Sequence, residues 1–136
     1  MHSLSRALLQ TVNQSTQPID INGIIPPGTV VRRFGCNCQL SGNGQQISGE
    51  GYYTLDGALT VEATAIGNVT AALYENGVLI PGTQVSGYAA AADAPITLPF
   101  VATLRKGCCD GASVITCGLV EGPGNMTNYT LRIQKV

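Results

Sequence analysis

The chain has very little charge, no tryptophan and a single histidine. Charged residues make up 11% of its 136 residues, against about 25% in an average soluble domain. The formal net charge is −1, and no basic run is longer than the pairs Arg32-Arg33 and Arg105-Lys106. A nucleic-acid-binding protein needs clustered positive charge, so we expect no nucleic-acid partner. No segment approaches the roughly 20 apolar residues of a membrane-spanning helix, so we expect no membrane partner either.

Groups suited to catalysis are equally scarce. The one histidine, His2, lies at the start of the chain, where residues are commonly poorly ordered. The eight carboxylates are scattered singly. Asp56 and Glu62 share one face of an expected strand, but six residues of strand separate them by about 20 Å, too far to act as a pair. Neither a Gly-x-Ser-x-Gly motif nor a phosphate-binding loop is present. We therefore expect no enzyme, no catalytic residue and no cofactor.

Residues 1–10 lack the apolar core of 7–15 residues that a signal peptide needs. From this we expect a protein that is made in a cytosol and is used there or assembled into a particle there.

The five cysteines do not form a recognisable framework. They are Cys36, Cys38, Cys108, Cys109 and Cys117. An odd number argues against a closed set of disulfides. The spacing also lacks the paired C-x₂₋₄-C segments of zinc sites, so no metal is expected. Cys36 and Cys38 fit one strand face together with Phe34 and Leu40. Two interpretations stay open: reduced buried thiols, which a cytosolic assembly favours, or a disulfide among these five residues.

Glycine and alternating apolar residues are abundant. Gly accounts for 17 of 136 residues. Apolar or small side chains occupy every odd position from 53 to 65, even positions from 96 to 104, and odd positions from 129 to 133. This period of two predicts half-buried β-strands. Residues 113–120 are apolar on both faces, which predicts a central strand or a subunit contact.

Turn signals separate these runs. Asn76-Gly77 predicts a tight hairpin, because both central residues of a type I′ turn need positive φ. We expect eight to ten strands of 5–12 residues and no convincing helix, although residues 3–12 fit a helical period as well as a strand. We therefore predict an all-β fold. Composition alone does not choose among a sandwich, a barrel and a jelly roll.

Residues 1–25 form an apolar N-terminal arm, followed by one domain over 26–136. The candidate partner-binding residues in the arm are Leu4, Leu8, Leu9, Val12, Ile19 and Ile21. Such a segment is too apolar for a solvated tail. It is either a docking segment for a partner or an extra edge strand of the domain, and the sequence leaves both open.

Three motifs occur in the order found in a known family. They are Gly51-Tyr52-Tyr53-Thr54-Leu55, the segment 69–77 that ends in Asn-Gly, and the Gly/Asp turn at 107–111 before the apolar run 112–120. Over about residues 28–136 the chain resembles the C1q/TNF-like jelly roll. The resemblance implies an antiparallel jelly-roll sandwich that assembles as a homotrimer. The chain departs from the family in having no collagen-like stalk and few aromatic residues in its late strands.

The whole sequence, including Ser5-Arg6-Ala7-Leu8 and residues 28–36, is also similar to small virion proteins of phages that infect Gram-positive bacteria. That resemblance implies a capsid decoration or head-fibre protein, with the major capsid protein as its partner. It would be assembled in the bacterial host cytoplasm, lie on the virion surface, and stabilise the shell or mediate adhesion. Two alternatives remain: a tip domain that binds a receptor or cell-surface carbohydrate, and a spore-surface or secreted adhesion domain.

Overall fold

The computed structural model describes residues 6–42, 44–107, 111–122 and 124–136. Over these ranges the chain forms twelve strands. The described residues contain no helix that is long and apolar enough to cross a membrane. The strands are β1 (Leu8–Asn13), β2 (Gln17–Ile19), β3 (Thr29–Phe34), β4 (Cys38–Ser41), β5 (Gly44–Ile47), β6 (Gly51–Ala63), β7 (Gly67–Glu75), β8 (Val78–Leu79), β9 (Val85–Ala89), β10 (Pro95–Lys106), β11 (Ser113–Glu121) and β12 (Gly124–Lys135).

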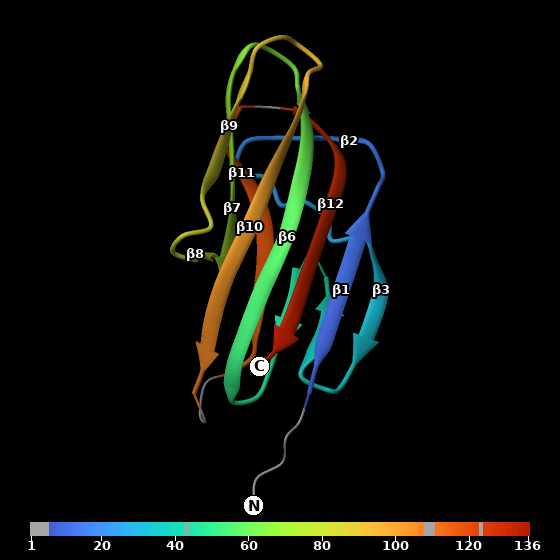
Figure 1. Ribbon diagram of the computed structural model, residues 1–136, viewed down its shortest axis with the longest axis vertical. Helices are drawn as coiled ribbons and strands as arrows, with labels where there is room; N and C mark the ends of the chain where they lie inside the picture. Colours follow the sequence, from blue (N-terminus) through green and yellow to red (C-terminus); the bar gives the residue numbers. More distant parts are fainter. Residues whose placement is uncertain (1–5, 43, 108–110, 123) are drawn as a thin grey trace, which may run out of the picture.

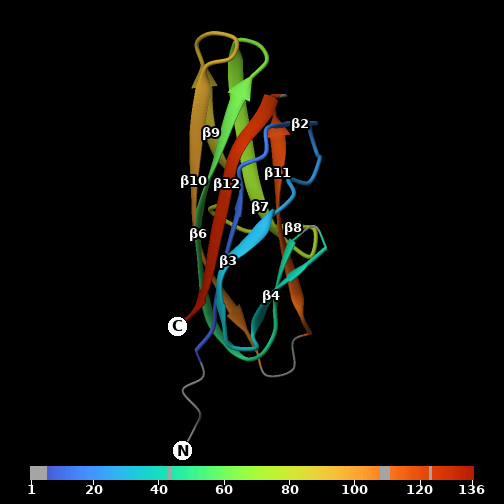
Figure 2. The ribbon, with the colours of Figure 1, turned by 90° about the vertical axis from the view of Figure 1, so that its right-hand side faces the viewer.

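Two antiparallel sheets pack face to face (Figures 1 and 2). Sheet A has the order β10-β6-β12-β1-β3, with β2 paired to one end of β12. Sheet B has the order β4-β5-β11-β7-β8, with β9 also paired to β7. The arrangement is the all-β jelly-roll sandwich that the family resemblance implies.

The three long strands of sheet A follow the predicted alternation. In β6 the inward positions Tyr53, Leu55, Leu59 and Val61 are fully buried, while the positions between them are at least partly exposed. The corresponding inward residues of β10 and β12 pack against the same core. Because a strand turns successive side chains to opposite faces, one face of each long strand builds the core and the other remains outside.

β11 is the central strand of sheet B and confirms the prediction for a segment that is apolar on both faces. Its first residues pair with β5 and its later residues with β7. The Asn76-Gly77 hairpin is also confirmed, between β7 and β8, with φ of 51° and 84° at the two residues. The strand count exceeds the expected eight to ten, since β2, β4, β5 and β8 are only two to four residues long. Strands this short show no measurable alternation.

The N-terminal segment is woven into both sheets. Residues 8–13 form a strand, not a helix, and lie between β12 and β3. The chain then pairs with β12 through β2 and crosses to sheet B. There the Asn22 N–H donates to the Leu119 carbonyl (2.8 Å) and the Ile25 N–H to the Cys117 carbonyl (2.8 Å). This segment therefore occupies the side of β11 that β5 leaves open.

The sandwich has two distinct ends. We call the base the end at which β1 begins and β12 finishes, where Leu8 lies opposite Gln134. The tip is the opposite end, where β6 finishes and β10 begins, with Glu62 opposite Pro95 (Figure 1).

Candidate interaction surfaces

The predicted arm residues separate into two groups. Leu9 and Ile19 are buried in the core, whereas Leu8 and Val12 are half-buried on the outward face of sheet A. Ile21 is exposed beside β11. Leu4 lies outside the described residues. Alternation along β1 explains the split, because neighbouring residues of a strand point to opposite faces.

The outward face of sheet A, which we call face A, is a five-strand surface built from cross-strand rows. Its central row consists of Val101, Asp56, Arg132, Gln10 and Arg32, each opposite the next on adjacent strands. Asp56 and Arg132 form a bidentate pair, with Nε to Oδ1 at 3.0 Å and Nη2 to Oδ2 at 2.6 Å. The hydrogen bonds to Asp56 and its charge raise the pKa of Arg132. The pair neutralises the centre of the face, although an exposed pair contributes little to stability.

Small and apolar side chains surround this row. On one side lie Pro99, Ala58, Thr130 and Val12, in register across four strands. A shallow depression of about 420 Å³ lies over Gly57. A Cβ on Gly57 would approach the Thr130 carbonyl oxygen to 2.2 Å, so glycine keeps the strands in register there. Face A is therefore flat, almost neutral and partly apolar.

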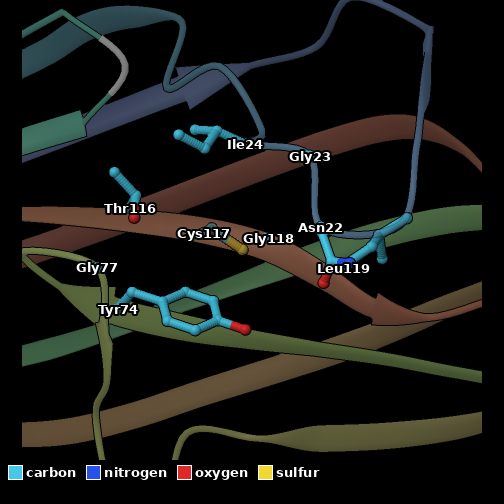
Figure 3. A pocket seen from close by; sticks show the side chains of 9 residues that line it. All are labelled: Asn22, Gly23, Ile24, Tyr74, Gly77, Thr116, Cys117, Gly118 and Leu119. Carbon is cyan, nitrogen blue, oxygen red and sulfur yellow. The ribbon is translucent and has the colours of Figure 1, made fainter.

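The outward face of sheet B carries a smaller pocket of about 230 Å³. Figure 3 shows the Tyr74 ring on one side, Ile24 and Asn22 on the other, and Gly118 of β11 between them. Because Gly118 has no side chain, the floor is open. Ligand pockets usually enclose about 300–1,000 Å³, so this one is large enough only for a single side chain.

A buried polar cluster joins β10, β11 and β7 at the base. The Lys106 ammonium donates to Ser113 Oγ and to the Gly111 carbonyl, both at 2.6 Å. Ser113 Oγ in turn donates to Glu75 Oε2 at 2.6 Å. A serine beside a lysine can act as a nucleophile in enzymes, but the Ser113 side chain belongs to a residue only 1% exposed. The hydrogen bonds of the cluster tie the three strands together.

The structure places the cysteines in different surroundings. Cys36, Cys38 and Cys117 are free thiols, and Cys108 and Cys109 lie outside the described residues. The expected common face of Cys36 and Cys38 is wrong: the chain bends between β3 and β4, which leaves Cys36 exposed and Cys38 buried. Burial raises the pKa of Cys38 to about 11 and raises the pKa of Cys117 as well. Among the described residues, no group of three or more His, Cys, Asp or Glu could hold a metal ion.

Solved structures share this architecture over almost the whole chain. Murine APRIL is similar with a TM-score of 0.71 and 11% identity, covering 96% of this chain and 99% of that one. The globular domain of the zebrafish complement 1qA protein is similar with a TM-score of 0.66 and 11% identity, covering 96% of each. The vertex protein P5 of phage PRD1 is similar with a TM-score of 0.60 and 12% identity, covering 98% and 99%. No protein-family model matches the sequence. No curated protein matches it either. The fold is the C1q/TNF-like jelly roll.

Proposed function

We propose that this chain is a non-catalytic virion structural protein that binds the surface of a phage capsid as a homotrimer. There it stabilises the shell or mediates adhesion. The observation that carries the proposal is the shared fold with a phage vertex protein over 98% of the chain. The scarcity of charge fits a protein whose surface is largely covered in an assembly.

Face A is the surface that suits self-association. The charges of Asp56 and Arg132 at its centre compensate each other, Arg32 lies on the edge strand β3, and Val101 stands 74% exposed beside Asp56. On sheet B, in contrast, the segment 21–25 of the same chain pairs with the edge of β11, and a Cβ on Gly118 would meet the Gly23 carbonyl oxygen at 3.0 Å. Three copies that bring face A to a common axis form a closed ring, which an oligomer of limited size requires. In such a ring all three bases point the same way.

The partner of the trimer is the major capsid protein, and the virion surface is its location, reached by assembly in the bacterial host cytoplasm. Leu9 and Ile19 are part of the domain's own core and cannot contact the shell while the chain is folded. Among the described arm residues, Ile21 and Ile24 are exposed aliphatic side chains, and they lie beside Leu119 and Gly118 in the half of β11 nearer the tip.

Cryo-electron microscopy of particles made with and without this chain tests the proposal. We expect three-fold density of the sandwich on the outer surface only when the chain is present. The proposal would be contradicted if the particles carried no such density although the folded protein was present in the same sample. Light scattering of the purified protein should give three times the 14.1 kDa chain mass.

A further inference from the structure

The charged residues are segregated along the long axis of the sandwich. All seven basic residues lie at the base or in the central row of face A: Arg6, Arg32, Arg33, Arg105, Lys106, Arg132 and Lys135. The tip carries Asp20, Glu62, Asp93 and Glu121 and none of the seven. The described acidic residues of the base are Glu50 and Glu75, and Glu75 is engaged by Ser113.

The register of the strands shows how this separation arises. At the base, Arg105 lies opposite Tyr52 and Lys135 opposite Tyr53. At the tip, Glu62 lies opposite Pro95, and the Asp93 N–H donates to the Ala63 carbonyl. Residues distant in sequence thus meet at one end because neighbouring strands are antiparallel.

The two ends act independently on a partner. Ten residues of β6 separate Tyr52 from Glu62, about 33 Å at the rise of an extended strand. The Debye length is about 8 Å at physiological salt, so the field of one end is screened before it reaches the other. The net charge of −1 therefore conceals a basic end and an acidic end.

The base also presents apolar side chains. Tyr52 is 54% exposed beside Arg105, and Phe34 follows Arg33 at the end of β3 and is half exposed. Arginine with aromatic side chains is the composition typical of protein–protein interfaces. The basic residues are few, and Glu50 lies in the turn before β6 at the same end, which suits an acidic protein surface better than the dense phosphates of nucleic acid.

We propose that the base docks on an acidic protein surface of the shell, and that repulsion between that surface and the acidic tip fixes the orientation with the tip outward. This inference rests on the proposed function. Like-charge contacts suppress wrong orientations as effectively as opposite charges favour the right one. In a trimer with parallel axes the three bases act together, and the second and third contacts become intramolecular.

Two matched double variants test the inference. R6E/R105E reverses two exposed charges of the base, and D20K/E62K reverses the exposed Asp20 and the partly exposed Glu62 of the tip. Neither pair touches the Lys106 cluster or the Asp56–Arg132 pair. Binding to empty capsid particles produced without this chain is measured over a series of NaCl concentrations. The circular dichroism spectrum and the oligomer mass confirm that each variant is folded.

We expect R6E/R105E to bind at least about tenfold more weakly at 0.15 M salt, with the difference shrinking as salt rises. D20K/E62K should bind at least as tightly as the unaltered chain and should decorate in both orientations. Equal binding by all three proteins would overturn the inference. So would head-to-tail filaments of the unaltered protein at low salt, or equally tight binding to double-stranded DNA. Failure of the unaltered protein to bind particles at any salt would instead overturn the proposed function.

Discussion

Lys106 is a buried lysine on the inward face of β10. The even-position alternation from 96 to 104 continues to 106, so the pattern itself places a lysine on the inward face. A buried ammonium needs partners, because an unpaired charge in the interior is strongly destabilising. Those partners, Ser113 and Gly111, follow five to seven residues later in the chain. The inward lysine was therefore a readable signal, whereas the acceptor that completes the cluster, Glu75, required the topology.

Ser113→Ala should lower the free energy of unfolding by about 1–3 kcal/mol, because it removes one acceptor from the buried ammonium and leaves Glu75 without its donor. Urea denaturation at pH 7 measures the change. Ser86→Ala is the control. Its hydroxyl lies 2.7 Å from that of Thr70, but the residue is exposed, so loss of this hydroxyl should cost about 0.5 kcal/mol or less. Equal losses of unfolding free energy in the two variants would show that the buried cluster around Ser113 contributes no more than an exposed hydroxyl pair.

Stability should fall as pH rises above about 9. Burial raises the pKa of Cys38 from 9.0 to about 11, so between these values the folded state keeps a proton that the unfolded state has lost. Each such group removes up to about 1.4 kcal/mol per pH unit. Burial raises the pKa of Cys117, Tyr53 and Tyr129 too, which adds to the decline at higher pH.

Urea denaturation between pH 8 and 10.5 under reducing conditions checks this expectation. Cys38→Ala should make the decline between pH 9 and 10.5 shallower, whereas Cys36→Ala, which removes an exposed thiol, should leave it unchanged. An identical slope in both variants would exclude Cys38 as a source.

At the scale of elements, the long strands were predictable and the short ones were not. Alternation over nine or more residues located β6 and β10, alternation over residues 129–133 located part of β12, and a run that is apolar on both faces located β11. Burial of one or both faces is a property of the local pattern. β1 spans only six residues whose spacing suits a helix or a strand, and its place between β12 and β3 is decided by pairing with residues more than 100 positions away. Because this pairing partner is so far away in the sequence, the local pattern also could not show which of the candidate arm residues face the core and which face outward.

Substitutions at two glycines distinguish the cost of a positive φ from the cost of a steric clash. Gly28 and Gly77 have φ of 86° and 84°. A Cβ on Gly28 would lie 2.2 Å from the Val12 carbonyl oxygen, whereas a Cβ on Gly77 meets nothing within 4 Å. Gly77→Ala should cost about 1–2 kcal/mol for the positive φ alone. Gly28→Ala should cost several kcal/mol in addition, because β1 must move away, and thermal melting of both proteins compares them. Similar melting temperatures would show that β1 shifts freely.

Deletion of residues 1–25 should prevent folding. It removes β1 from within sheet A, exposing β12, and removes the buried Leu9, Ile19 and Ile25 from the core. Circular dichroism and proteolysis measure the outcome. The double variant Ile21→Ser/Ile24→Ser, which changes only exposed aliphatic residues of the same segment, should stay folded. A folded deletion product that no longer binds capsids would instead identify the segment as a pure docking arm.

For the whole molecule, the sequence predicts the sandwich but not its two ends. A nearly neutral chain with scattered charges shows no polarity until the antiparallel register gathers Arg6, Arg105 and Lys135 at one end and Glu62 and Asp93 at the other. Face A arises in the same way, from rows contributed by five strands. Such surfaces combine residues that are distant in the sequence, so short sequence patterns cannot predict them.

The proposed role of face A as the trimer contact can be tested by placing a charge on it and measuring the oligomeric state. Val101→Arg places a charge in the central row, beside Asp56, where three copies would have to bury it. A buried charge without a complete set of partners costs several kcal/mol, so the variant should be a folded monomer of 14.1 kDa by light scattering. Val78→Arg introduces the same charge on β8 of sheet B, at a residue 69% exposed, and should remain a trimer. If Val101→Arg remains a trimer while Val78→Arg becomes a monomer, the copies meet through sheet B.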